Sequence, residues 1–102
     1  MSCAHVTGDY SFERICFLRD ADLLTLLQNI DNEDLLFACI GMDQEFVQRI
    51  ASQFSSLGRQ YFLEDLSRFS LFGSVEQIRA ARLKIEAIYF SLIESGRLFR
   101  RD

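Results

Sequence analysis

The sequence predicts an all-α protein, a compact bundle of five to six helices. The 102 residues include no proline and only five glycines, which suits uninterrupted helices better than a turn-rich β sandwich. Residues typical of helix caps recur along the chain, and apolar residues follow them at spacings of three and four. The hydrophobic content of 49%, with ten phenylalanines, is enough for one core. A single domain is therefore expected over residues 10–102.

The first third of the chain contains a lead-in and one clear helix. Residues 1–9 are small, polar and unpatterned, so we expect a loose N-terminal segment there. A short helix or an extended piece is expected from Phe12 to Leu18. Either Asp20 or Asp22 can cap the next helix, whose apolar residues continue to Ile30.

Two further helices are predicted before residue 55. Asp31 or Asn32 ends the preceding helix and caps the segment EDLLFACI. Gly41 ends that segment at the position where a left-handed residue is needed. Asp43 opens a helix in which three apolar residues recur at spacing four, namely Phe46, Ile50 and Phe54.

The two longest helices come last. Ser55 or Ser56 opens one that continues through Phe69. The other begins at Ser74-Val75-Glu76-Gln77, which has the Ser-x-x-Gln form of a capping box. Its apolar stripe follows one face and consists of Ile78, Ala81, Ile85, Ile88 and Leu92. Gly96 is expected to stop it.

Charge and composition exclude several classes of function. A net charge of −4 argues against a nucleic-acid partner, which needs a basic field. No apolar run approaches the roughly 20 residues of a membrane span, and the N-terminus lacks the features of a signal peptide. The three cysteines, Cys3, Cys16 and Cys39, are widely spaced, which indicates reduced thiols in a cytosolic protein.

The segment GRQYFLEDLSRF, residues 58–69, carries the candidate binding residues. On a helical wheel Phe62, Leu66 and Phe69 share one face. Glu64, Asp65 and Arg68 are predicted to lie on the opposite side with Tyr61. Glu64 and Asp65 are each one turn from Arg68, a spacing that supports a helix by a few tenths of a kcal/mol. Outward carboxylates beside an arginine lack the burial that general acid catalysis needs. A solvated helix face and a partner-binding acidic ridge remain the two main interpretations.

No other constellation predicts chemistry. His5 is the only histidine, and with Cys3 it offers too few ligands for a closed zinc site. The chain has neither a glycine-rich phosphate loop nor a nucleophile elbow. We therefore expect no enzyme activity, no metal, no cofactor and no small-molecule substrate.

Several large apolar residues could fill the core or form a sticky surface patch. They flank the loop before Ser74 or lie beside the stripe of the last helix: Phe69, Leu71, Phe72, Tyr89, Phe90 and Ile93. Such residues more often fill the core of a small bundle, so the core is the favoured interpretation.

Taken in order, several segments resemble the C-terminal domain of FliG, the bacterial flagellar motor switch protein. SFERICFLRDADLLTLLQNID is similar to that family's VFEN-L-x6-IQ-x-LLQEVD, and NEDLLFACIG to its SE-x-LL-x-ALKG. FVQRIASQFSSLGRQYFLEDL resembles LREKFLRNMSQRAA-x-L-x-DDL. SVEQIRAARLKI and SLIESGRLF resemble L-x-x-VE-x-x-QKAI and RLAETGEMV. The likeness extends almost without gaps from Tyr10 to Phe99.

The resemblance implies a six-helix cytoplasmic domain on the flagellar rotor, beside the inner membrane at the basal body, acting in motility and chemotaxis. Family members face the stator protein MotA with charged residues on the helix that matches residues 56–69, and FliM-like switch proteins are further partners. The family's acidic pair falls on Glu64 and Asp65. Together with Arg68, Arg59 and Tyr61 they form the expected binding set.

Three basic positions of the family differ in this sequence. The lysine that precedes the glycine in the family's ALKG segment corresponds to Ile40 here. Two of the family's arginines correspond to Leu57 and Ser74. The family's Gly-Pro turn has become Leu71-Phe72-Gly73, and its MFxF hinge survives only as Asp9-Tyr10-Ser11-Phe12. A rotor component that contacts the stator is one expectation. A diverged adaptor that binds another motor or secretion protein through apolar surface is the alternative.

Overall fold

All regular structure in the described part of the chain is helical, as the sequence predicts. The computed structural model describes Phe12 and residues 14–98, and it contains no strand in that part. A short 3-10 helix, η1 (Arg14–Phe17), is followed by two short α-helices, α2 (Asp20–Gln28) and α3 (Asn32–Cys39). Three more complete the fold: α4 (Gln44–Ala51), α5 (Ser56–Phe69) and α6 (Val75–Glu94). Residues 1–9 and the predicted hinge remnant up to Ser11 lie outside the described residues.

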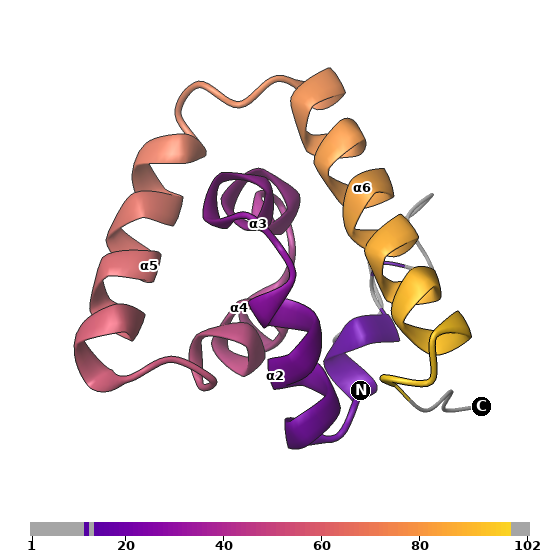
Figure 1. Ribbon diagram of the computed structural model, residues 1–102. Helices are drawn as coiled ribbons and strands as arrows, with labels where there is room; N and C mark the ends of the chain where they lie inside the picture. The colour runs from indigo at the N-terminus through magenta and orange to yellow at the C-terminus, as the bar shows by residue number, and fades with distance from the viewer. Residues whose placement is uncertain (1–11, 13, 99–102) are drawn as a thin grey trace.

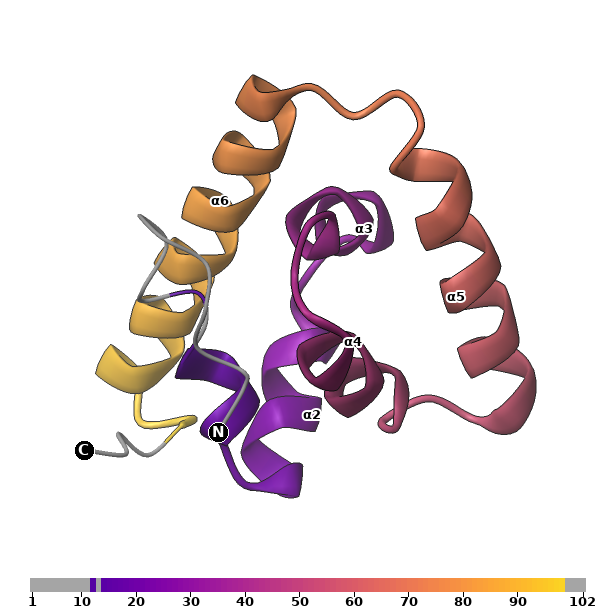
Figure 2. The ribbon, with the colours of Figure 1, turned by 180° about the vertical axis from the view of Figure 1, so that it is seen from behind.

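Helix α3 lies between the two longest helices. It packs mainly against α6 and also against α5, while α4 contacts both α5 and η1. Figure 1 shows α5 and α6 on opposite sides of α3, with the connection between them crossing at one end and α2 and α4 at the other. The same arrangement is visible from behind in Figure 2. The outer surfaces of α5 and α6 therefore point in different directions and can serve different contacts.

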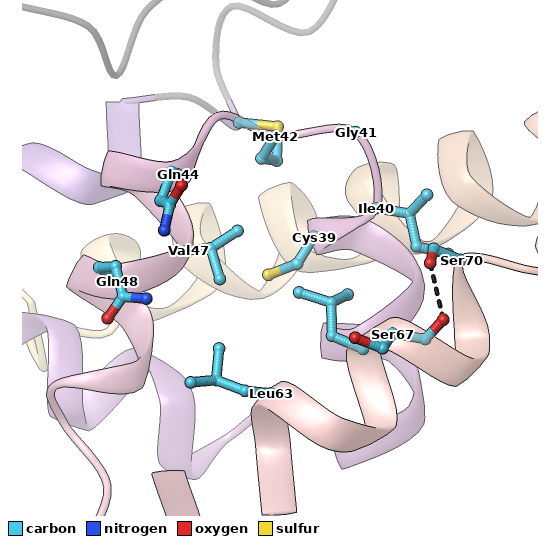
Figure 3. Close-up of a pocket in the computed structure, with 11 residues that line it drawn as sticks. Cys39, Ile40, Gly41, Met42, Gln44, Val47, Gln48, Leu63, Ser67 and Ser70 are labelled. Atoms are coloured by element: carbon cyan, nitrogen blue, oxygen red, sulfur yellow. Dashed lines mark hydrogen bonds between the residues drawn. The ribbon is translucent and has the colours of Figure 1, made fainter. Parts of the chain in front are cut away.

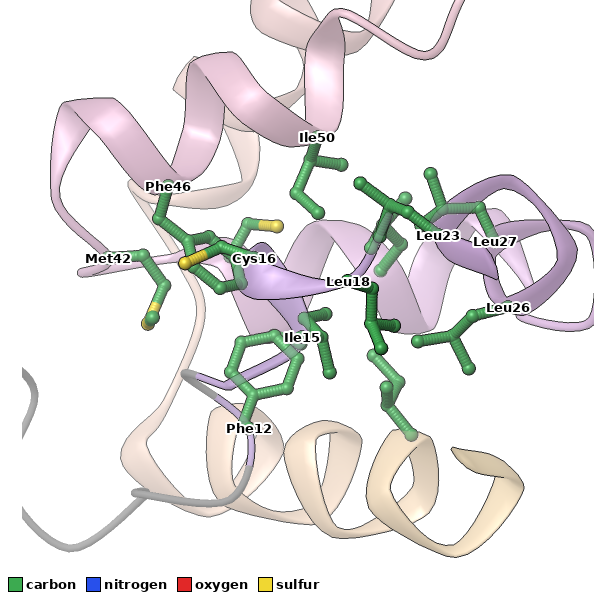
Figure 4. Packing of buried hydrophobic residues seen from close by; sticks show 14 of the residues in the cluster. Phe12, Ile15, Cys16, Leu18, Leu23, Leu26, Leu27, Met42, Phe46 and Ile50 are labelled. Carbon is green, nitrogen blue, oxygen red and sulfur yellow. The ribbon is translucent and has the colours of Figure 1, made fainter. Parts of the chain in front are cut away.

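The buried core draws residues from every helix. Phe12, Phe46 and Ile50 are fully buried, and the rings of Phe12 and Phe46 lie 5.2 Å apart. Figure 4 shows leucines of α2 meeting the side chains of η1 and α4 in this cluster. From α6 the core receives Ala81, Ile85 and Leu92, which belong to the predicted stripe. Burial of these side chains, each worth about 1.5–3 kcal/mol for a large apolar residue, supplies the main stabilisation.

The cap signals place most helix ends correctly. The Asp43 carboxylate accepts a hydrogen bond from the Phe46 backbone N–H at 2.9 Å, and the Ser55 hydroxyl accepts one from Gly58 at 3.1 Å. Ser74 and Gln77 form the complete capping box at the start of α6. Gly41 and Gly96 have φ values of 84° and 80°, the left-handed conformation expected after a helix.

The cap of α2 differs from the prediction. The helix begins at Asp20, and the preceding residue, Arg19, makes no side-chain cap. Asp22 is not a cap but lies inside the first turn and is buried, 3.6 Å from Arg19 Nη2. An acid in the first turn is favourable because it faces the positive end of the helix dipole, so both aspartates still support this terminus.

Two arginines bind backbone carbonyls at the ends of other helices. Arg82 of α6 is buried and donates to the carbonyls of Ala38, at 2.9 Å, and Ile40, at 2.6 Å. Arg49 of α4 donates to the carbonyls of Cys16 and Leu18 and to the Asp20 carboxylate. Each guanidinium satisfies carbonyls that the end of a helix leaves without partners. Sequence periodicity gave no signal for either role.

The apolar residues of the α5–α6 connection are not core residues, contrary to the favoured interpretation. Leu71 is 85% exposed and Phe72 is also exposed, whereas Phe69 packs against the core. Phe72 retains ring contacts with Phe37 and Phe69, at centroid distances of 6.3 and 5.1 Å. Leu71 therefore lies almost wholly in solvent, while Phe72 is exposed but still contacts α3 through Phe37. Tyr89 and Ile93 pack against the core, while Phe90 is exposed.

Within the described residues no helix combines the length and apolar character that crossing a membrane would require.

Candidate functional site

Helix α5 is held to the rest of the molecule along one side only. Phe62 is its buried residue, and its ring lies 5.2 Å from that of Phe54. Leu63, Leu66 and Phe69 are partly buried against the core, and the Phe69 ring meets Phe37 edge-on at 5.0 Å. These anchors at spacing three and four fix the rotation of the helix. The opposite side of α5 therefore presents a defined set of side chains to solvent.

All five predicted binding residues lie on α5. Arg59, Tyr61, Glu64 and Arg68 are exposed. Gln60 donates a hydrogen bond to the Glu64 carboxylate at 3.4 Å, and the Arg68 guanidinium bonds the Asp65 carboxylate. On the wheel of α5, Tyr61, Glu64, Asp65 and Arg68 lie within about 100° of one another, so one partner can contact these four. Arg59 lies only about 60° from the buried Phe62, so it is exposed on a different side, in the first turn of the helix.

Asp65 corrects the prediction that both acids point fully into water. Its side chain is only 29% exposed, while Glu64 is exposed. At 100° per residue, Asp65 lies only about 60° around the helix from the buried Phe62, whereas Glu64 lies about 160° away. Asp65 therefore occupies the edge of the packed face, where its bond to Arg68 compensates for partial burial. Of the two carboxylates, Glu64 is the one that points away from the packed face into solvent.

The charges on this face are mixed. The face carries Glu64, Asp65 and Arg68, and the Asp65 carboxylate is already bonded to Arg68. The description of the face as an acidic ridge is therefore too simple. A partner that approaches this face meets Glu64 as the charged group outside that ion pair. Recognition here depends on the positions of single charges, which favours specificity over bulk attraction.

A groove runs beside this face, between the end of α3, α4 and α5. Its volume is about 480 Å³. Apolar side chains form its floor, among them Ile40, Val47 and Leu63, and Figure 3 shows Gln44, Gln48, Ser67 and Ser70 around them. The lining contains no charged side chain, so the groove suits an uncharged, partly apolar segment of a partner.

The three positions at which the resembled family is basic have other roles in this structure. Ile40 lines the groove, and its Cδ1 would lie 2.7 Å from a Cβ at Gly73, so only glycine fits there without a shift. Ser74 caps α6. Leu57 is 58% exposed on the first turn of α5. Two of the three substitutions thus add apolar surface near the groove and α5, and the third adds a cap.

Residues 14–98 and Phe12 contain no cluster of three or more histidine, cysteine, aspartate or glutamate side chains that could hold a metal ion. Cys3 and His5 lie outside the described residues. Cys16 and Cys39 are both buried. Burial raises the pKa of Cys39 to about 12, and nearby Arg82 partly opposes that rise. A thiol with so high a pKa is protonated at neutral pH and is a poor nucleophile.

The comparisons with known proteins agree on one family. The family described as the FliG C-terminal domain matches residues 9–99. The chain is 28% identical over 91 residues to the flagellar motor switch protein FliG of Aquifex aeolicus, a match that covers 87% of this chain and 27% of the relative. The solved structure of full-length FliG from Aquifex aeolicus resembles this fold with a TM-score of 0.76 at 27% identity. That likeness covers 83% of this chain and 26% of the solved chain. The chain thus spans about a quarter of the length of the relatives it matches.

Proposed function

The chain belongs to the FliG C-terminal domain family, and from this membership we propose that it works as a component of the bacterial flagellar motor switch. Its outer α5 face would contact the stator, a MotA-like protein, during torque generation and rotational switching. FliM-like proteins of the switch complex would be further partners. The proposed location is the cytoplasmic side of the inner membrane, at the base of the flagellum, and the proposed role is non-catalytic.

One observation supports this proposal most strongly. Helix α5 is fixed by Phe62 and its partly buried neighbours, and it holds Glu64 and Tyr61 in water on the opposite side. Rigid elements position a binding group more precisely than loops do. Exposed charges on such a helix add little to folding, typically 0–1 kcal/mol for a surface ion pair, so their placement suits binding better than stability.

A direct binding experiment tests the stator contact. The chain would be titrated with the cytoplasmic domain of a MotA-like protein from the same organism, and Kd would be measured at two salt concentrations. Glu64→Lys should raise Kd at least about tenfold, because reversing a charge at a complementary contact costs more than about 1.4 kcal/mol. Higher salt should weaken the wild-type complex, since exposed charges are screened.

Glu94→Lys is the matched control, because it makes the same change in net charge at an exposed position on α6. It should leave Kd unchanged. Equal binding by the Glu64→Lys variant, or equal weakening by both variants, would contradict a specific contact at the α5 face.

The adaptor function is the second candidate, and the groove beside α5 favours it. Apolar residues stand at two positions where the family is basic, Ile40 in the groove and Leu57 on α5. An adaptor would use this surface for an uncharged segment of another motor or secretion protein. In the titration above, binding that is insensitive to both salt and Glu64→Lys would support the adaptor over the stator contact.

A further inference from the structure

Helix α6 has a second apolar stripe on its solvent side. Ala80, Leu83, Ala87 and Phe90 follow one another at spacings of three, four and three, and all four are exposed. Leu83 is 57% exposed and Phe90 is 43% exposed. On a wheel of 100° per residue, their mean direction is about 180° from that of the buried Ile85. A surface helix in a monomer normally carries polar residues there, so α6 is apolar on two opposite sides.

The pattern of this outer stripe is that of a helix-pairing seam. Alternating spacings of three and four keep a line of residues facing a partner helix, as in coiled coils. Along this seam a small residue and a large residue alternate. Glu76 lies four residues before Ala80, and Glu94 lies four residues after Phe90. These two charged residues confine the apolar part of the seam to the middle of the helix. Small side chains at every seventh position allow the two helix backbones to approach closely.

We propose that α6 pairs antiparallel with α6 of a second copy of this chain. In the register centred on residue 85, Ala80 lies opposite Phe90 of the second copy, and Leu83 lies opposite Ala87. Every layer then places one large side chain against one alanine, so the seam is complementary to itself. A parallel pair would instead place Phe90 against Phe90 and Ala87 against Ala87, leaving one layer overfilled and the next nearly empty.

A hollow in the surface lies where this register would bring Phe90 of the second copy. It has a volume of about 650 Å³ and is lined on the α6 side by Ala80, Leu83 and Lys84, and on the α3 side by Asp34 and Phe37. The Lys84 ammonium bonds the Asp34 carboxylate at 3.1 Å, so the charges in the lining are paired. The Phe90 ring is braced by an edge contact with Tyr89 at 5.2 Å. The two-fold arrangement would insert each Phe90 into the hollow of the other copy.

The size of the seam sets the strength of the expected dimer. Helix α6 is 20 residues long, or about 30 Å, and the apolar part covers only its middle. One helix pair of this length buries less than the roughly 1,600 Å² of a standard interface, so we expect a weak, reversible dimer with a Kd in the micromolar range. This dimer would use α6 and leave α5 free, so the inference stands independently of the proposed stator contact.

Sedimentation equilibrium of the full chain, from micromolar to 1 mM, measures the self-association. The wild type should show a reversible monomer–dimer equilibrium, and Leu83→Glu should raise the Kd at least about tenfold. Leu57→Glu is the matched control, because Leu57 is exposed to almost the same degree but lies on α5. It should dimerise like the wild type. Thermal unfolding of dilute samples would show that both variants are folded.

Cysteine cross-linking then tests the direction of the pair. In a Cys3→Ser background, a chain carrying Ala80→Cys would be mixed with a chain carrying Phe90→Cys under mild oxidation. The antiparallel register requires mixed dimers and little cross-linking of either variant with itself. Self-cross-linking of each variant would show a parallel pair and overturn the register.

Two further results would overturn the proposal. A wild-type chain that remains monomeric at 1 mM would show that the α6 seam does not pair with itself. A helix of another protein would then be the partner to test. A dimer that survives Leu83→Glu, or that Leu57→Glu disrupts equally, would place the interface elsewhere.

Discussion

Arg82 is the residue whose side chain ties the central helix to the longest one. Its buried guanidinium donates to the carbonyls of Ala38 and Ile40 at the end of α3 and lies over the Phe12 ring, 5.6 Å from the centroid. These contacts link residues more than 40 positions apart in the sequence. Hydrogen bonds from a charged donor to otherwise unpaired carbonyls contribute more than neutral ones.

We expect Arg82→Met to destabilise the domain by about 2–4 kcal/mol, because it leaves buried carbonyls without a donor. Arg82→Lys should recover little, since one ammonium cannot reproduce the planar fork that reaches two carbonyls. Arg79→Met, at an exposed position one turn earlier, is the control and should change stability by less than about 0.5 kcal/mol. Urea unfolding followed by circular dichroism measures all three. If Arg82→Met lowered the free energy of unfolding no more than the control does, the carbonyls of Ala38 and Ile40 would have found other partners.

Cys39 gives the domain a defined sensitivity to alkaline pH. Its thiol has a pKa of about 12 in the folded protein, because burial raises it, against 9.0 as its ordinary value. The unfolded chain therefore loses this proton first as pH rises above 9. Stability linked to Cys39 is fully present below pH 9 and falls between about pH 9 and 12, by up to about 1.4 kcal/mol per pH unit.

The measurement is urea unfolding from pH 8 to pH 10.5 for the wild type and for Cys39→Ala. The variant should be somewhat less stable at pH 8, because the alanine leaves a small cavity. Its stability should then fall less steeply with pH than that of the wild type. Parallel pH curves would mean that the Cys39 thiol ionises as easily in the folded protein as in the unfolded chain.

At the scale of single helices, local sequence determines where most of the helices begin and end. Asp43, Ser55 and Ser74 cap helices through bonds that depend only on residues three positions apart, and such local signals are visible in a sequence. Tertiary packing decided the positions that the sequence reasoning missed. Asp22 is buried because α2 docks by that side, and Asp65 is half-buried because it lies beside the packed face of α5.

The capping box at the start of α6 is the sharpest local prediction to test. Ser74→Ala should cost about 1 kcal/mol, because the hydroxyl that accepts from the Gln77 backbone N–H at 3.1 Å is lost. Ser74→Gly should cost only a few tenths, since glycine is tolerated at this position. Thermal unfolding compares the two. Equal losses would indicate that the serine hydroxyl is not the stabilising element.

At the scale of the whole molecule, α3 separates two surfaces with different characters. The α5 side combines single exposed charges with an uncharged groove, and the α6 side carries an apolar seam beside a hollow. The helical bundle and the family were predictable, because apolar periodicity and the order of segments are properties of the chain itself. The exposure of Leu71 and Phe72, the groove and the seam's hollow were not, because each arises from residues of different helices that only the tertiary structure brings together.

The central claim is that the outer face of α5 binds a stator protein through Glu64. The most direct measurement is swimming in soft agar by the native motile organism, with Glu64→Lys introduced into the gene for this chain. The variant should spread poorly although its melting temperature is unchanged, and a charge reversal on the facing residue of the stator should partly restore spreading. Glu94→Lys should swim normally. Normal swimming by the Glu64→Lys strain, with the stable variant present at wild-type level, would contradict the claim.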